Sequence, residues 1–568
     1  MIYSIHKKTL FQVFAGFVIC LILVLGWSQF GDAKEPTTKL LDESVDVRSD
    51  KTWTITFNKA IARATINSHS VYVLDASGRK VNGKLTVSAD GKEVFIMPPL
   101  EGYKQSATYN LYVTQLVKDD DGRALNYQIQ KRFTIASTAT FDVATVQSNG
   151  STSVVKSYPT YKEAIANVGA HHVILHKGGI IKMPAGIVVT KPTSASVLTT
   201  LYLDKELKKE ETYVADDTEF HYIDSTEHYV EVNVAGKSRF IKHENSRLFP
   251  WNAVQYQSFY YTTNGALYHS VYTASTGNYG TYQAGIAPSF MRDGDKYYSM
   301  DGSHFITKDG VNAGIGYQYF QYLPVRSVTK YTAQEIDAYI MKRLKQLETT
   351  FPNHKEYAQA ASKSKLIGIG ELLKKIEKEQ QINALHILAL AQHESNYGLT
   401  TWAQQYNNLF GLYVYDDNPD HRLFESVEQN IRELVTIFLN KNYIPPNAKY
   451  ANGAIFGNKA IGFNIKYASD PYWGSKAAGH LYRIDQMMGG KDIANPFKLG
   501  LTNRSGLNVR TGPGTNYPIA FTYDKSEVPL IIIDDMLPEK SWIKIQSDSL
   551  QYEELYVHRS YVEELPVP

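Results

Sequence analysis

The length and composition of this chain predict a multidomain globular protein. Its 568 residues exceed what one hydrophobic core supports, and 43% of them are hydrophobic, which lets each of several domains bury its own core. The formal net charge of +2 and the lack of a long basic run argue against nucleic acid as the main ligand. The single cysteine, Cys20, lies near the N-terminus, so the rest of the chain can use neither disulfides nor thiol catalysis.

Residues 1–33 have the pattern of a targeting segment. Two lysines at positions 7 and 8 precede an apolar run over residues 10–27, and Gly31 and Ala33 form a small-x-small cleavage pattern. The pattern predicts a signal peptide that is cleaved after Ala33. The alternative is a retained signal anchor, because the run is about as long as a membrane span. Either reading predicts export, and only the second makes the membrane a partner.

Residues 38–137 alternate apolar and polar side chains with the period of a β-strand. Trp53, Ile55 and Phe57 fall on one face of an early strand, and glycine-containing turns separate the strands that follow. Several short strands with closely spaced turns predict a β-sandwich. Through "KTWTITFNKAI" and "VYVLDASGRKV" the segment also resembles the Ig-like modules of bacterial surface proteins, which implies an Ig-like fold.

Two further β-rich segments follow. Residues 138–248 contain the alternating positions Val230, Val232 and Val234, and the surrounding stretch loosely resembles a small SH3-like barrel. Residues 249–330 are crowded with tyrosine, as in "FYYTTNGALYHSVY". We expect this second segment to be β-rich and to pack against the domain that follows it.

Residues 331–488 change to the period of a helix. Within them, the stretch "INALHILALAQHESNYG" predicts a helix that ends near Gly398 and carries Glu394 close to its C-terminal end. Ile387 and Leu390 lie seven and four residues before Glu394, so the carboxyl extends the buried stripe of the helix. Desolvation raises the pKa of a carboxyl, and a carboxyl that is still protonated near neutral pH can act as a general acid. A surface glutamate that ends a helix is the structural alternative.

The histidines near Glu394 do not form a complete metal-binding motif. His393-Glu394 begins like a zinc-binding H-E-x-x-H motif, but Tyr397 occupies the position of the second histidine. His386 and His393 alone lack a third convergent ligand. The sequence therefore predicts no metal and no other cofactor.

Three ordered motifs resemble the family-73 glycoside hydrolases, the N-acetylglucosaminidase autolysins of Gram-positive bacteria. They are "AQHESNYG" around Glu394, "YNNLFG" ending at Gly411, and "YASDPYW" beginning at Tyr467. The resemblance implies an α+β, lysozyme-like helical catalytic domain over residues 331–488, with a cleft between a helical lobe and a small β-lobe. It also implies that Glu394 is the general acid and that Tyr467 lines the cleft near the scissile bond.

The resemblance leaves the other site residues less determined. Glycosidases usually use two carboxyl groups, and the expected β-lobe offers Asp416, Asp417 and Asp420, with Glu425 just beyond. We favour Asp417, and attack by the 2-acetamido group of the substrate is the alternative. Asp470 is expected to cap a helix whose first turn holds Pro471. Predicted substrate contacts, each with core packing as the alternative, are Asn408, Phe410, Tyr413, Trp402 and Trp473.

The C-terminal residues 498–568 return to short strands. Their "GLNVRTGPGTNYPIAFTY" resembles the start of a bacterial SH3-like wall-binding module, which implies a small β-barrel that attaches the enzyme to the cell wall. Linking a weak wall binder to a catalytic domain raises the effective concentration of the enzyme at an insoluble substrate.

Three hypotheses about function remain. The first is an exported endo-β-N-acetylglucosaminidase that cuts peptidoglycan glycan strands between N-acetylglucosamine and N-acetylmuramic acid, outside the cell or in the wall of a Gram-positive bacterium. The second is a lytic transglycosylase that uses the same Glu394 and leaves an anhydro product. The third is a wall-binding scaffold without catalytic activity.

Overall fold

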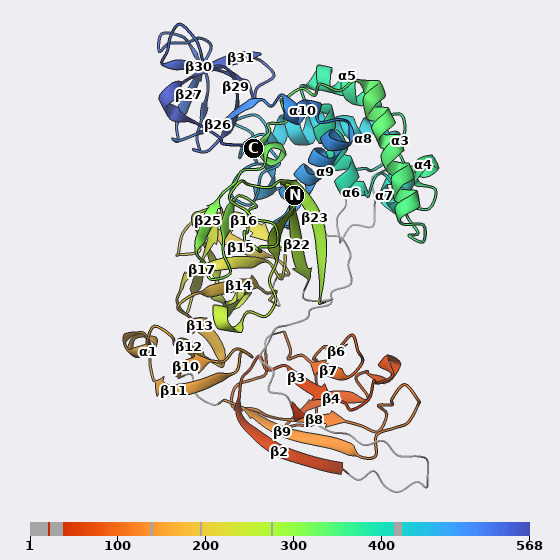
Figure 1. Ribbon diagram of the computed structural model, residues 1–568. Helices are drawn as coiled ribbons and strands as arrows, with labels where there is room; N and C mark the ends of the chain where they lie inside the picture. The colour runs from red at the N-terminus through yellow and green to blue at the C-terminus, as the bar shows by residue number, and fades with distance from the viewer. Residues whose placement is uncertain are drawn as a thin grey trace.

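The computed structural model describes residues 21–22, 38–100, 102–136, 140–193, 196–273, 277–413 and 423–567. Figure 1 shows several β-rich parts followed by a helical part and a final β-rich module. Among the described residues, no helix is both long and apolar enough to span a membrane. The predicted targeting segment, 1–33, lies outside the described residues apart from the short strand β1 (Leu21–Ile22).

The first β-rich part is built around one hydrophobic core. Its further strands are β2 (Thr38–Val47), β3 (Trp53–Thr56), β4 (Val71–Asp75), β5 (Lys80–Val81), β6 (Leu85–Val87), β7 (Glu93–Ile96), β8 (Thr108–Val113) and β9 (Gln128–Ile135). They form two sheets, with the orders β1-β3-β7-β6 and β2-β9-β8-β4-β5. Trp53, Ile55 and Phe57 are all buried, as the alternation predicts, and the ring of Trp53 lies 4.9 Å from that of Phe133 on the opposite sheet.

The second part joins two sheets over a shared core. Its elements are β10 (Phe141–Val146), β11 (Thr152–Tyr158), α1 (Tyr161–Asn167), β12 (Val173–His176), β13 (Gly179–Lys182), β14 (Gly186–Thr190), β15 (Thr199–Tyr202), β16 (Glu210–Val214), β17 (Glu219–Ser225), β18 (Tyr229–Val234), β19 (Lys237–Lys242) and β20 (Ser246–Pro250). The sheet orders are β11-β10-β12-β13 and β16-β15-β19-β18-β17-β14-β20. Val230, Val232 and Val234 are buried, as predicted. We call β14–β20, residues 186–250, the middle module.

The tyrosine-rich segment is β-rich and packs on the helical part, as expected. It contains β21 (Phe259–Thr263), β22 (Ala266–Thr273), β23 (Asn278–Ile286), β24 (His304–Ile306), β25 (Asn312–Ile315) and the short helix α2 (Tyr319–Tyr322). Strand β23 lies against helix α9 (Trp473–Met487). The contact is so close that a Cβ atom at Gly479 would lie 2.1 Å from the backbone oxygen of Gln283, so glycine is required there.

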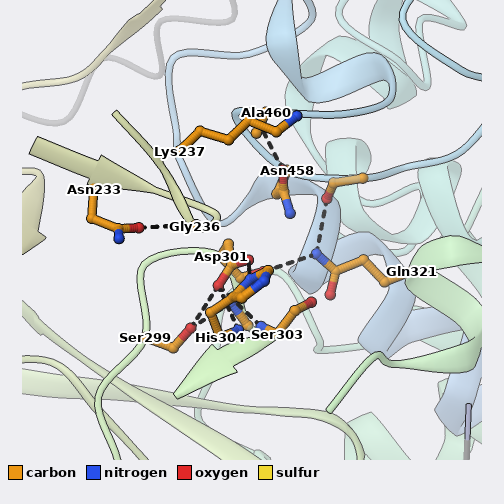
Figure 2. A network of polar contacts seen from close by, with 12 residues as sticks. Asn233, Gly236, Lys237, Ser299, Asp301, Ser303, His304, Gln321, Asn458 and Ala460 are labelled. Carbon is orange, nitrogen blue, oxygen red and sulfur yellow. Dashed lines mark hydrogen bonds and ion pairs between the residues drawn. The ribbon is translucent and has the colours of Figure 1, made fainter. Parts of the chain in front are cut away.

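A polar network ties this segment to the helical part (Figure 2). The buried Asp301 carboxylate accepts hydrogen bonds from the backbone N–H groups of Ser303 and His304 and contacts His304 Nδ1 at 2.7 Å. The Gln321 amide then donates to the backbone oxygens of Asp301 and Gly457, at 3.3 and 3.0 Å. Because these groups are buried, their hydrogen bonds fix the orientation of the two parts.

The helical part carries the largest hydrophobic core. Besides α9 it contains α3 (Ala333–Thr350), α4 (Ala360–Lys363), α5 (Gly370–Gln380), α6 (Ala384–Ser395), α7 (Thr401–Tyr406), α8 (Val427–Glu433), the π-helix η4 (Leu434–Tyr443), the 3₁₀-helix η5 (Phe463–Ile465) and α10 (Lys491–Ala494). A capping box between Thr332 and Glu335 begins α3. Most of the expected small β-lobe, residues 414–422, lies outside the described residues.

The C-terminal module is a seven-stranded sheet. Its strands are β26 (Lys498–Thr502), β27 (Leu507–Arg510), β28 (Ile519–Tyr523), β29 (Pro529–Asp534), β30 (Trp542–Gln546), β31 (Glu554–His558) and β32 (Val562–Glu564). The order β28-β27-β31-β30-β29-β26-β32 is open, so the strand pairings of the described residues do not close the expected barrel.

The C-terminal module is docked on the helical part. Leu499, Ile531 and Leu565 belong to the hydrophobic core of the helical part. The buried Arg326 guanidinium donates to the backbone oxygen of Asp548 at 3.1 Å. The module therefore shares part of its core with the helical part.

Candidate active site

Helix α6 fixes the position of Glu394. The Asn383 side chain caps the start of the helix by accepting hydrogen bonds from the backbone N–H groups of Leu385 and His386. Ile387 and Leu390 are buried, as predicted, but so are the other faces of α6: among its residues only His393 and Glu394 are not buried. The helix ends at Ser395 rather than beside Gly398, because Asn396 and Tyr397 both adopt left-handed backbone conformations.

The environment of Glu394 favours its protonated form. Burial raises the pKa of the Glu394 carboxyl to about 7, although the indole hydrogen bond opposes the shift, and the negative charge of Asp470 raises it further. The Trp473 indole Nε1 donates this hydrogen bond to Glu394 Oε1 at 2.5 Å. The side chain remains partly accessible to solvent. A carboxyl with this pKa is half protonated at neutral pH and can give its proton to an incoming oxygen.

Tyr467 and Trp473 form an aromatic pair beside the carboxyl. Their rings stack at 4.4 Å with an interplanar angle of 28°, and their exposed fractions are 1% and 3%. Burial, followed by the nearby charge of Glu394, raises the pKa of Tyr467 well above its usual value. The Tyr467 hydroxyl has no hydrogen-bond partner among the described residues. The structure therefore brings Glu394 and Tyr467 together, and it buries Trp473 in the core, which is the alternative to sugar stacking for this residue.

Asp470 contributes charge to this site and holds the start of α9. Its carboxylate accepts a hydrogen bond from the Tyr472 backbone N–H at 2.9 Å and pairs with Lys476 at 2.5 Å. Burial alone would raise the pKa of Asp470, but the Lys476 ammonium and these hydrogen bonds hold it below its usual value. Helix α9 begins at Trp473, and Tyr472 occupies the N-cap position. Asp470 therefore lies in a turn before the helix and is not the predicted N-cap residue.

The other predicted substrate contacts lie elsewhere in the fold. Asn408 is buried, and its amide bonds to both backbone groups of Leu412 and to the Asn430 side chain. Its hydrogen bonds therefore hold a loop. Phe410 is buried in the core of the helical part. Tyr413 is only partly buried, and its hydroxyl donates to Glu433 at 2.5 Å.

Trp402 and the acidic residues complete the predicted set. Trp402 is partly exposed on α7, with its ring 5.2 Å from that of Tyr406. Asp416, Asp417 and Asp420 lie outside the described residues, so their expected roles stay predictions. Glu425 is exposed just before Ser426, which caps α8 by accepting a hydrogen bond from the Gln429 backbone N–H.

The two histidines of α6 make different contacts. Burial lowers the pKa of His386 to about 4, and its Nε2 lies 3.2 Å from the backbone oxygen of Leu323. The His393 ring lies 5.7 Å from that of His480. Within the described part of the chain, no three His, Cys, Asp or Glu side chains are grouped as a metal site requires.

Three hydrogen bonds, made by two side chains that sequence reasoning missed, hold the segment carrying Tyr467. The buried Lys459 ammonium donates to the backbone oxygen of Asn464 at 2.8 Å and also contacts that of Ala468. The Thr212 hydroxyl of β16 donates to the backbone oxygen of Ile465 at 2.6 Å. The bond between Thr212 and Ile465 joins residues 253 positions apart, and no local pattern in the sequence indicates it.

Comparison with protein families identifies two parts of the chain. Residues 370–486 match the family described as mannosyl-glycoprotein endo-beta-N-acetylglucosaminidase, and residues 37–135 match the bacterial Ig-like domain. Residues 370–486 form a glucosaminidase domain. This is a glycoside hydrolase domain, and it contains Glu394, Tyr467, Asp470 and Trp473. The domain assignment agrees with the resemblance seen in the sequence motifs.

Similar proteins carry the same kind of domain. Two proteins of Streptococcus pneumoniae strains, each named "Putative endo-beta-N-acetylglucosaminidase", are 30% identical to this chain over 206 residues. The match covers 36% of this chain but only 27% and 25% of those proteins. The matched part therefore spans about a quarter of the length of these relatives.

Two solved structures are similar to this chain at low sequence identity. Autolysin E of S. aureus has a TM-score of 0.21 and 15% identity, over 30% of this chain and 72% of that one. Its complex with the disaccharide NAG-NAM has a TM-score of 0.22 and 14% identity, over 33% and 82%.

Proposed function

We propose that this protein is an exported peptidoglycan hydrolase, an endo-β-N-acetylglucosaminidase that cuts the bond between N-acetylglucosamine and N-acetylmuramic acid. The observation that carries the proposal is Glu394, a carboxyl in the glucosaminidase domain whose pKa is raised to about 7. Glycosidases need an acid of this kind, because the leaving sugar oxygen must receive a proton as the bond breaks.

The proposed reaction follows from the positions of these groups. Glu394 gives its proton to the glycosidic oxygen, positive charge develops at the anomeric carbon, and water completes the hydrolysis. The Trp473 indole holds one carboxyl oxygen and leaves the other for the substrate. For the group that stabilises the positive charge, the two predictions are the Asp417 carboxylate and the 2-acetamido group of the substrate itself.

Product analysis on purified peptidoglycan tests the reaction. Mass spectrometry of wild-type digests should show fragments with a free reducing N-acetylglucosamine, and Glu394→Gln should reduce their formation by at least about 10³-fold. Glu371→Gln is the matched control, because that glutamate is exposed on α5 and is not among the predicted site residues. Anhydro products would instead identify a lytic transglycosylase. An intact wall after wild-type treatment would favour a binding scaffold.

We also propose that the C-terminal module is SH3-like and attaches the enzyme to the wall. Deleting residues 498–568 is a poor test, because the deletion would uncover apolar residues of the catalytic core. Tyr517 and Ile519 are exposed on the module. Replacing both by serine should reduce sedimentation with insoluble wall while the melting temperature stays constant. Equal sedimentation of both proteins would contradict this attachment role.

A further inference from the structure

The backbone on both sides of Tyr467 is held by groups that lie outside its own segment. In residues 464–469, which the structure describes in full, five backbone oxygens accept hydrogen bonds from such groups. They belong to Asn464, Ile465, Lys466, Ala468 and Ser469. The path of this segment is therefore set by its surroundings.

Three of these five bonds come from one stretch of the middle module. The Thr212 hydroxyl of β16 donates to the backbone oxygen of Ile465 at 2.6 Å. The Tyr213 hydroxyl, next on the same strand, donates to the backbone oxygen of Lys466 at 3.1 Å. The residue that follows β16 donates through its backbone N–H to the oxygen of Ser469 at 2.9 Å. Strand β16 thus runs along the segment and fixes it from the side of the middle module.

The other two bonds come from the ammonium of Lys459, which is fully buried. This ammonium donates to the backbone oxygens of Asn464 and Ala468, and it lies 3.3 Å from the Thr212 hydroxyl oxygen. An ammonium has three N–H donors, so these three oxygens satisfy it completely, as a buried charge requires. Because Asn464 and Ala468 lie on opposite sides of Tyr467 in sequence, one cation holds the segment at two points.

Lys459 is itself held in a tight turn. The Asn458 side chain accepts a hydrogen bond from the Ala460 backbone N–H at 2.8 Å (Figure 2), and its amide donates to the Tyr322 hydroxyl at 3.4 Å. Gly457 has a φ of 63°, and a Cβ atom there would lie 2.0 Å from a backbone oxygen of the same turn. The turn that carries the ammonium is therefore anchored to α2 of the tyrosine-rich segment.

The Tyr467 side chain depends on this support of its backbone. Its hydroxyl is buried and has no hydrogen-bond partner among the described residues. The ring is held by stacking on Trp473 at 4.4 Å, and the Trp473 indole donates to Glu394. Because no polar contact of its own fixes the hydroxyl, a shift of the backbone would move it relative to the Glu394 carboxyl.

We propose that Lys459 and Thr212 are positioning residues for the reaction, and that together they place Tyr467 beside the Glu394 carboxyl. Neither side chain needs to touch the substrate for this role. The middle module thereby supports the active site through the backbone of the catalytic domain. This inference rests on the proposed glucosaminidase function, because it gives Tyr467 a place in that reaction.

The first test measures kcat and KM of full-length variants on soluble glycan fragments. Thr212→Val keeps the shape of the side chain and removes the hydroxyl, and it should lower kcat about tenfold with KM within about twofold, because the loss lies in positioning. Thr212→Ser retains the hydroxyl and should keep kcat within about twofold. Lys459→Met removes the ammonium and should lower kcat about 10²-fold. If Lys459→Met does not fold, the contrast between the two Thr212 variants decides the test.

Ser225→Ala is the control for lost stability of the middle module. It removes two buried hydrogen bonds, one to the Ile181 backbone oxygen at 2.7 Å and one with the Tyr222 hydroxyl at 2.8 Å, and neither involves residues 464–469. Its kcat should equal that of the wild type. An unchanged kcat in Thr212→Val, or an equal fall in Thr212→Ser or Ser225→Ala, would overturn the proposal.

A spectroscopic measurement separates this inference from the proposed reaction, because it needs no substrate. Fluorine-19 NMR of protein labelled with fluorotryptophan gives one resonance for each tryptophan, and the resonance of Trp473 is the one missing in Trp473→Phe. Because the Tyr467 ring stacks on Trp473, this resonance should shift in Thr212→Val and stay in place in Thr212→Ser and Ser225→Ala.

The two possible failures give different results. A Trp473 resonance that stays in place in Thr212→Val would overturn the positioning role even if the wild type cleaves peptidoglycan. A wild type that releases no reducing sugar would refute the proposed function, while the shifted resonance would still show that Thr212 places Tyr467.

Discussion

The hydrogen bond from Trp473 to Glu394 should affect the pH dependence of catalysis, and this effect can be tested. Glu394 must be protonated to act as an acid, so kcat/KM should fall as the pH rises through about 7, the pKa of this carboxyl. The indole hydrogen bond lowers that pKa, because it stabilises the ionised form. Trp473→Phe removes the donor and keeps an aromatic ring against Tyr467.

The expected shift follows from the strength of such a bond. A hydrogen bond to a charged group contributes about 1.5–3 kcal/mol, and one pKa unit corresponds to about 1.4 kcal/mol. Because the Glu394 side chain is partly accessible to solvent, we expect the lower end of this range. The alkaline limb of the kcat/KM profile should therefore move up by about one pH unit in Trp473→Phe.

The matched variant is Asp470→Asn, which should move the same limb in the opposite direction. The Asp470 charge raises the pKa of Glu394, so its removal should lower that pKa. The profiles are measured on a soluble glycan between pH 4 and 10, after thermal unfolding has confirmed that both variants fold. A limb that stays in place in both variants, or that moves in the same direction in both, would refute this electrostatic account.

Three predictions concern stability. Asn408→Ala should lower the free energy of unfolding by about 2–4 kcal/mol in denaturant titrations, because both backbone groups of Leu412 lose buried partners. A decrease of less than about 0.5 kcal/mol would show that the Asn408 side chain does not hold the loop. Gly479→Ala should lower the melting temperature, since its Cβ would lie 2.1 Å from the Gln283 oxygen; an unaltered value would exclude the close contact. Removal of residues 498–568 should destabilise the helical part in calorimetry, whereas a tethered module could be removed without effect.

The sequence was sufficient to predict features that depend on local periodicity. The spacing of Ile387, Leu390 and Glu394 predicts a carboxyl near the end of a helix that buries the residues four and seven positions before it, and both of these residues are buried. The helix is also buried on its other faces, which this spacing did not predict. The alternation around Val230 likewise predicts a buried strand face. For the strand, the side-chain direction follows from the period of a single element, so no knowledge of distant contacts is needed.

Features that depend on contacts between distant elements could not be predicted in this way. The sequence leaves both sugar stacking and core packing open for Trp473, and its hydrogen bond to Glu394 depends on how α9 packs on α6. The Asn408 amide could form hydrogen bonds with a sugar as well as with the backbone, but in the structure this side chain is buried. The docking of the C-terminal module rests on contacts such as Arg326 with Asp548, which are 222 positions apart.

The most direct test of the central claim is a titration of the Glu394 carboxyl itself. Isotope-edited infrared or carbon-13 NMR difference spectra, wild type minus Glu394→Gln, report the protonation of this one group as a function of pH. The account predicts a midpoint near pH 7, because burial disfavours the charged carboxylate. A midpoint near 4.5, the ordinary value for glutamate, would show that Glu394 is ionised at neutral pH and is not the proton donor.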